Sequence, residues 1–306
     1  MTQTGFTLWL PELLYSDKAF HTRRPLLCNE HGLIASTVEP PTPIELRHRA
    51  LLPGLVNAHS HAFQRVIRGR TEYRTSDKDS FWTWREMMYS AAERLSPEDI
   101  YDASRMAFLE MALSGITAVG EFHYLHGSED GAKYDDANLL SKQVIRAAQD
   151  VGLRIVLLRV AYTRAGFEVD ANPRQRRFIE GPDTYLRNVE ALTEFCADQP
   201  MVSVGAAPHS VRAVPLNYLK EIGEFAAARQ LPVHMHVAEQ PAEVSACVEE
   251  YGRSPVALLS TEGLLTERFT AVHAIHVSPK AVGMLARANA IVCACPTTER
   301  NLGDGI

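Results

Sequence analysis

From residue 51 onward the chain alternates short apolar runs with amphipathic segments, and this alternation limits the fold more than any other feature. The apolar runs are nearly continuous and several are rich in Val, Ile and Ala, which is typical of strands buried on both faces of a parallel sheet. They cover residues 51–60, 116–125, 153–163, 202–210, 231–239, 269–277 and 288–298.

Helical patterns lie between these runs, over residues 96–115, 136–152, 182–198, 214–230 and 278–289. The first of them opens with Ser96 as N-cap and Pro97 at the first helical position, and Gly115 closes it. A regular succession of strand and helix implies a parallel sheet with right-handed crossovers. Seven strand candidates favour a TIM-like (β/α) barrel, although periodicity alone leaves a doubly wound sheet open.

Residues 1–50 do not follow this alternation. We expect them to form short antiparallel strands that belong to a small β-sandwich domain, with the barrel over residues 51–306. The chain has 306 residues, of which 46% are hydrophobic, and this is enough for a sizeable core.

The composition excludes several classes of partner. A formal net charge of −6, with no run of like charges, predicts binding to neither nucleic acid nor an anionic membrane surface. No segment reaches the length of a membrane span, and the N-terminus has no basic leader. The five scattered cysteines indicate reduced thiols in a cytoplasmic protein. Cys293 and Cys295 could bind a metal, but we expect two small apolar residues on a strand.

Polar residues gather at the C-terminal ends of the apolar runs. They are His59, His61, Glu121, His123, Tyr124, His209, His236, Glu239, His273 and His276. In a barrel all these ends open onto one face, where catalytic groups lie. A buried histidine needs a polar partner. A purely structural role is therefore plausible for any single one of these histidines but improbable for all of them together.

A divalent metal explains the set. Neutral imidazole suits zinc or iron(II). His59 and His61 lie two residues apart and so share one face of a strand. We expect the third ligand to be His236 rather than His234, because Glu239 follows His236 by three residues and can reach the same barrel mouth.

Several motifs together resemble the amidohydrolase superfamily in its deaminase and chlorohydrolase branch: "PGLVNAHSH", "HVAE", "VHAIHV" and "CPTTERNLGDG". Four further stretches resemble the formimidoylglutamate deiminases of histidine degradation: "HAFQR", "FWTWRE", "EFHYLHG" and "APHSVR". The resemblance covers essentially the whole chain. It implies a homodimeric enzyme that uses one divalent ion, Zn²⁺ by default and Fe²⁺ as the alternative. The implied reaction converts a small dicarboxylate, N-formimino-L-glutamate, to N-formyl-L-glutamate and ammonia.

The resemblance also implies roles for single residues. His59, His61 and His236 match metal ligands, and Glu239 and His273 match the proton-transfer residues. The substrate pocket is matched by Gln64, Arg85, Tyr124, His209 and Arg212. These residue types suit the chemistry, because a metal lowers the pKa of bound water to about 7. A carboxyl group can then protonate the leaving nitrogen, and two arginines can each bind one carboxylate.

Some of these residues have a simpler interpretation. Arg85 could stack on Trp82 or Trp84. Gln64 could cap the following helix, and Tyr124 could pack at the barrel rim. We interpret His123, His126 and His276 as structural, and Glu121 as a buried partner of a ligand histidine.

The chain departs from the superfamily pattern near its last residues, "NLGDGI". The resemblance implies an aspartate at the end of an eighth strand in the metal site, and Asp304 does not match that position. We therefore expect a fragment of a longer enzyme that binds metal weakly and turns over little substrate. Two other functions stay open: a related amidohydrolase that deaminates a purine or another ring, and a non-catalytic metal-binding protein.

Overall fold

The computed structural model describes residues 5–36, 39–71 and 81–305. It divides into two compact units, Met1–Leu55 and Val56–Ile306. Within the described residues, no helix combines the length and the apolar character that crossing a membrane requires.

The first unit holds a four-stranded sheet built around its longest strand, β1 (Phe6–Ser16). Strands β2 (Ala19–Thr22) and β3 (Leu26–Asn29) pair with β1 in antiparallel fashion, as expected. Strand β4 (Ile44–Leu51) pairs with β1 in parallel, so the expectation of antiparallel strands is wrong for β4. Strand β3 ends with Asn29 beside Phe6, the first residue of β1, so the chain is already at the starting end of β1 and β4 can run parallel to it.

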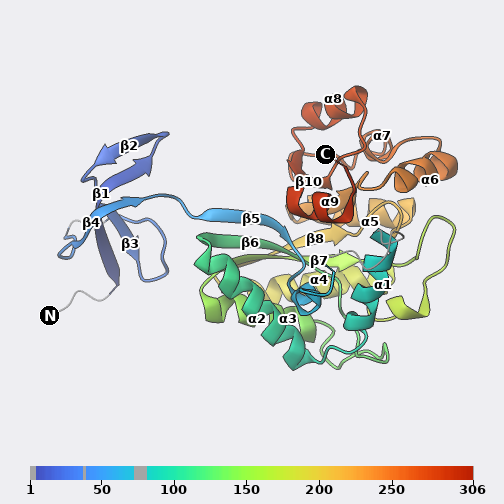
Figure 1. Ribbon diagram of the computed structural model, residues 1–306, viewed down its shortest axis with the longest axis horizontal. Coiled ribbons are helices and arrows are strands. Elements are labelled where there is room, and N and C mark those ends of the chain that lie inside the picture. Colours follow the sequence, from blue (N-terminus) through green and yellow to red (C-terminus); the bar gives the residue numbers. More distant parts are fainter. Residues whose placement is uncertain (1–4, 37–38, 72–80, 306) are drawn as a thin grey trace. The chain divides into compact units, whose positions relative to one another are not determined.

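The second unit contains a seven-stranded sheet whose strands follow chain order (Figure 1). They are β5 (Leu55–Ser60), β6 (Ile116–His123), β7 (Arg154–Ala161), β8 (Val202–Pro208), β9 (Val233–Val237), β10 (Phe269–His273) and β11 (Ile291–Cys293). From β6 to β11 each neighbouring pair is parallel. Together with its helices, this sheet is a TIM-like barrel that lacks one strand, as the sequence predicts.

Helices connect these strands. They are α1 (Phe81–Ala92), α2 (Pro97–Leu113), α3 (Leu139–Val151), α4 (Pro182–Cys196), α5 (Leu216–Ala228), α6 (Pro241–Tyr251), α7 (Pro255–Thr261), α8 (Pro279–Arg287) and α9 (Pro296–Leu302), with 3-10 turns η1 (Ala62–Ile67) and η2 (Pro173–Gln175). The five predicted helices are confirmed as α2 to α5 and α8. Ser96 caps α2 as expected, since its hydroxyl accepts the N–H of Asp99.

The last predicted strand, over residues 288–298, is confirmed but is much shorter than expected. Only Ile291–Cys293 form a strand, and α9 begins at Pro296. Proline at the first helical position costs no hydrogen bond, so the apolar run ends as a helix start.

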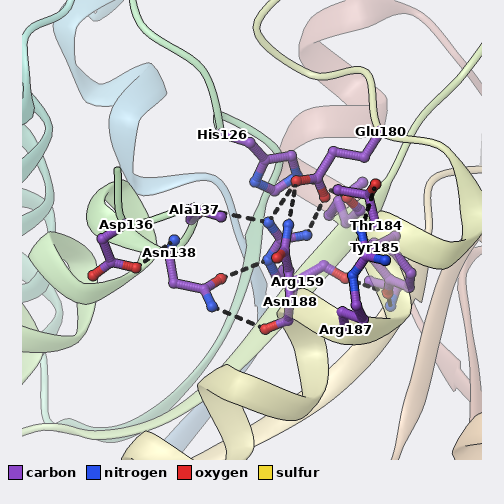
Figure 2. A network of polar contacts seen from close by, with 12 residues as sticks. His126, Asp136, Ala137, Asn138, Arg159, Glu180, Thr184, Tyr185, Arg187 and Asn188 are labelled. Carbon is purple, nitrogen blue, oxygen red and sulfur yellow. Dashed lines mark hydrogen bonds and ion pairs between the residues drawn. The ribbon is translucent and has the colours of Figure 1, made fainter. Parts of the chain in front are cut away.

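A buried arginine ties the strand β7 to the segments around it (Figure 2). Arg159 is fully buried and forms an ion pair with Glu180. Its Nε donates to Oδ1 of Asn138 at 2.8 Å, and Asn188 donates to Glu180 at 2.7 Å. Although burial raises the pKa of Glu180, the charges of His126 and Arg159 and these hydrogen bonds hold that pKa at about 2.

A second buried arginine holds the neighbouring loops. The guanidinium of Arg177 donates to the carbonyls of Gly127 and Leu95, both at 2.9 Å, and to that of Ala92. Because Phe178 follows directly and lines the cavity described below, these bonds fix part of its wall.

Removing the charge of Arg159 should destabilise the fold strongly, because Glu180 would stay buried without its cation. We expect Arg159→Met to lower the free energy of unfolding by about 3–5 kcal/mol. As control, Lys220→Met breaks a more exposed pair with Glu262 and should cost at most about 1 kcal/mol. Urea unfolding measures both, and equal losses would contradict the structural role of Arg159.

Candidate metal centre and active site

Three histidines from two distant strands converge at one end of the barrel. His59 lies in β5, His61 follows that strand directly, and His236 lies in β9. The Nε2 atom of His59 lies 3.0 Å from Nε2 of His61 and 3.1 Å from Nε2 of His236. One ring nitrogen from each lies within 4.8 Å of the other two.

The backbone of β5 and β6 explains why this end of the sheet is so tight. A Cβ atom on Gly120 of β6 would lie 2.5 Å from the carbonyl oxygen of Ala58, next to His59. Only glycine allows this approach, which holds β5 close against its neighbour.

Backbone carbonyls orient two of the three rings. His61 Nδ1 lies 3.0 Å from the carbonyl oxygen of Phe122, and His236 Nδ1 lies 3.2 Å from that of His209. A carbonyl only accepts, so Nδ1 carries the proton in both rings and each Nε2 presents a lone pair. Both lone pairs face Nε2 of His59, which can donate to only one of them. A cation at this point would satisfy all three nitrogens.

The electrostatics suit a metal ligand set. Burial lowers the pKa of His61 to about 4 and also holds the pKa values of His59 and His236 well below the usual range. All three rings are therefore neutral at pH 7, the form that binds metal. Tetrahedral zinc–imidazole bonds would separate the nitrogens by about 3.3 Å. The separations of 3.0 and 3.1 Å are close to this value, so the three residues fit a divalent ion such as zinc.

Glu121 does not touch a ligand ring through any hydrogen bond among the described residues, contrary to expectation. Its Oε1 instead accepts the N–H of Ala62 at 2.7 Å, at the start of η1. It is fully buried, and burial raises its pKa to about 8. The carbonyl of Phe122, the next residue, takes the role that we assigned to Glu121.

A carboxyl–imidazole–carboxyl chain lies beside the three histidines. His273 ends β10, and its Nε2 lies 3.5 Å from Oε1 of Glu239. On the other side of the ring, Nδ1 lies 3.2 Å from Oε1 of Glu299 in α9. Burial, with the charges of Asp304 and Glu243 adding to it, raises the pKa of Glu239 to about 8. A carboxyl group with this pKa can hold or release a proton near neutral pH.

All ten residues predicted as metal ligands, proton-transfer residues or substrate-binding residues line one cavity of about 100 Å³. A second cavity of about 250 Å³ shares Arg85, His209, Arg212, His236 and Glu239 with it. The structure therefore brings the predicted ligand, proton-transfer and substrate residues into one place.

The predicted substrate residues make specific contacts. Gln64 donates from Nε2 to the hydroxyl of Tyr124 at 2.8 Å, so its amide points toward the cavity rather than capping a helix. Arg212 donates to the carbonyl of Ala165 at 3.0 Å. The guanidinium of Arg85 lies over the ring of Tyr89, 5.6 Å from its centre. The alternative stacking partner Trp82 has its side chain outside the described part of the structure.

Sequence reasoning missed four polar residues of the cavity region. Gln175 donates from one Nε2 to the hydroxyls of both Tyr89 and Tyr162, each at 2.9 Å, and both tyrosines line the cavity. These residues are far apart in the sequence, so no local pattern reveals their contact. Glu299 had a signal in the sequence, because an acidic residue shortly after a proline such as Pro296 is typical of the first turn of a helix. In the structure its carboxylate accepts the backbone N–H of Cys295.

Two of the three histidines that we interpreted as structural, His126 and His276, form hydrogen bonds to the backbone. His126 donates from Nε2 to the carbonyl of Val160, and His276 donates to that of Asp304, both at 2.8 Å. All five cysteines are free thiols. Cys293 ends β11, but Cys295 lies at the N-cap of α9, so the expectation of two strand residues is wrong for Cys295. Its sulfur lies within 4.8 Å of ligand atoms of His273 and Glu299.

Comparison with known proteins identifies the family. Residues 50–306 match the model of the amidohydrolase family. A formimidoylglutamate deiminase of Pseudomonas aeruginosa is 43% identical over 259 residues, 84% of this chain and 56% of that protein. A 5-methylthioadenosine/S-adenosylhomocysteine deaminase of Pyrococcus abyssi is 28% identical over 86% of this chain and 55% of its own length. The chain thus spans little more than half the length of these relatives.

Solved structures show the same fold. An amidohydrolase from Brucella melitensis superposes with a TM-score of 0.86 and 33% identity, covering 98% of this chain and 67% of its own. An adenosine deaminase from Xanthomonas campestris with bound zinc superposes with a TM-score of 0.80 at 21% identity, covering the whole of this chain and 66% of its own.

Stability should fall as pH rises through the titration of Glu121. The folded chain keeps this proton up to a pH of about 8, whereas the unfolded chain releases it above its ordinary pKa of 4.5. The stabilising contribution of protonated Glu121 to the free energy of unfolding is therefore fully present below pH 4.5 and is lost as pH rises to about 8. Glu121→Gln should flatten this decline in urea unfolding across the window. Glu98→Gln, at an exposed position, should follow the parent chain, and an unchanged slope for Glu121→Gln would contradict the assignment.

Zinc binding should depend on the histidine trio. We expect one Zn²⁺ per chain by calorimetry after chelator treatment, and His236→Ala should weaken binding by more than about 10-fold. His234→Asn provides the matched control, since His234 lies on the same strand outside the trio. Equal affinity in the parent and His236→Ala would remove His236 from the site.

Proposed function

Because the chain belongs to the amidohydrolase family, we propose that it carries the active site of a metal-dependent deiminase. The reaction is hydrolysis of N-formimino-L-glutamate to N-formyl-L-glutamate and ammonia, as in histidine degradation. One observation carries the proposal: a buried Glu239–His273 pair adjoins three converging imidazoles in a cavity that also contains two guanidinium groups. The 43% identity to a formimidoylglutamate deiminase supports the same substrate.

His59, His61 and His236 would hold one divalent ion, with zinc as the default and iron(II) suited to the same nitrogens. Such an ion supplies a Lewis acid that lowers the pKa of water to about 7. The protein's own contribution is the fixed orientation of the rings, which the carbonyls of Phe122 and His209 provide.

Glu239 is placed to manage the proton of the reaction. Its pKa of about 8 lets it hold a proton at neutral pH and give it to the leaving nitrogen, which then departs as ammonia. His273 Nε2, 3.5 Å away, can accept or return that proton. A purely metal-binding protein would have no use for this pair.

The substrate carries two carboxylates, and the cavity offers two arginines. Arg85 and Arg212 line both adjoining cavities, and each guanidinium can bind a carboxylate through two parallel hydrogen bonds. Gln64 and Tyr124 add neutral hydrogen-bonding groups next to His61. A neutral ring substrate would not need two cations, which weighs against the purine-deaminase alternative that the Pyrococcus relative represents.

The activity is proposed for the whole protein, as are the homodimer and the cytoplasmic location. Asp304 lies in the loop after α9 and accepts a hydrogen bond from the side chain of Gln240. We do not assign Asp304 as a fourth metal ligand.

Substrate identity is best tested by binding, which does not need turnover. We expect zinc-loaded chain to bind the product N-formyl-L-glutamate in calorimetry, and Arg85→Met or Arg212→Met to weaken this by about 10- to 100-fold each, the cost of one charge-assisted pair. The exposed Arg187→Met serves as control. If neither variant weakens binding, or if 5-methylthioadenosine binds instead, the assignment to formimino-glutamate is wrong.

A further inference from the structure

We propose that Glu299 is a positioning residue that fixes the tautomer of His273. Its carboxyl oxygen holds the ring proton on Nδ1, so that Nε2 presents a lone pair toward Glu239. The kinetic consequence of this bond rests on the proposed function, whereas the bond itself does not.

The hydrogen-bonding pattern determines the tautomer. Oε1 of Glu299 lies 3.2 Å from Nδ1 of His273 and accepts the N–H of Cys295 at 2.8 Å. This oxygen already accepts one backbone N–H, so it faces the ring as an acceptor and Nδ1 must donate. A neutral imidazole carries a single proton, which leaves Nε2 unprotonated.

Both partners are shielded from water. His273 is 6% exposed and Glu299 is 7% exposed, so solvent cannot replace the bond if it is lost. The ring of His273 also stacks on that of His236, with centroids 5.5 Å apart. The stack fixes the plane of the ring, and Glu299 selects which nitrogen of that plane is protonated.

The backbone at His273 is unusual in a way that supports this role. His273 has a φ of 69°, in the left-handed region that costs a non-glycine residue about 1–2 kcal/mol. The following residue, Ala274, has a φ of 53°. Such strain persists only where the surroundings over-determine the position, and it clusters at functional sites.

The order Glu239–His273–Glu299 then works as a proton relay. Nε2 can take a proton from Glu239 or from the attacking water and return it to the leaving nitrogen, while Nδ1 keeps its own proton against Glu299 throughout. With the other tautomer, Nε2 would already carry a proton and could not accept one.

Glu299 also caps α9 through Cys295, so a purely structural role must be separated from a positioning role. Glu299→Gln removes the charge but keeps an amide oxygen that can accept from both N–H groups. Glu299→Ala removes the acceptor. The two variants therefore differ in whether the side chain at position 299 can still accept the hydrogen bond from Nδ1 of His273.

The tautomer itself can be read by long-range ¹⁵N–¹H correlation spectra of the histidine rings in the zinc-loaded chain. We expect His273 to be protonated on Nδ1 in the parent and in Glu299→Gln, and to shift toward protonation on Nε2 in Glu299→Ala. His126, whose Nε2 donates to Val160, is an internal control that should not change. An unchanged His273 tautomer in Glu299→Ala overturns the proposal.

Kinetics of ammonia release from formimino-glutamate give the second test. Glu299→Ala should lower kcat by about 10- to 100-fold, as losing an orienting partner does. KM and zinc content should stay near those of the parent, and Glu299→Gln should restore most of kcat. In a His273→Ala background, Glu299→Ala should cause no further loss, and a full additional loss would indicate a structural role instead. If no substrate is turned over, the proposed function fails, while the spectra still decide the role of Glu299.

Discussion

Three neutral imidazoles that present lone pairs to one another are the constraint on which the rest of this site depends. The carbonyls of Phe122 and His209 keep the protons of His61 and His236 on Nδ1. Neither ring can therefore move its proton to Nε2 to separate the lone pairs that face each other there. Nε2 of His59 can donate to only one of the two lone pairs, so a shared cation would satisfy all three nitrogens better than one proton can. The orienting groups are backbone atoms at strand ends, so the barrel itself specifies the site.

At this end of the barrel, the candidate metal ligands and the candidate proton-transfer groups come from different kinds of segment. The strands carry the histidines, while the carboxyl groups come from the segments that follow them, with Glu239 just after β9 and Glu299 on α9. Arg159 and Arg177, both buried, hold the loops beyond β6 and β7 in place. Buried ion pairs are costly to assemble, and here they order loops whose side chains line the cavity.

Much of this arrangement follows from local sequence patterns. Apolar runs and caps predicted β5 to β10 and five of the helices. Polar residues at strand ends and the family resemblance together identified ten residues that line one cavity. The parallel pairing of β4 was missed because strand pairing depends on tertiary topology rather than on periodicity. The helix at Pro296 was missed because the apolar run was extended past this proline. Contacts such as Gln175 with Tyr89, 86 residues apart, exist only after the tertiary fold has formed.

The bridge formed by Gln175 has a consequence for which molecules can enter. One amide nitrogen holds the hydroxyls of Tyr89 and Tyr162 at 2.9 Å each, so the gap between the two rings cannot widen unless a buried hydrogen bond breaks. The fold therefore fixes the distance between these two hydroxyl groups before any ligand binds. Because Tyr89 and Tyr162 both line the cavity, this bridge makes that part of its wall a preformed surface that a ligand meets without rearranging it.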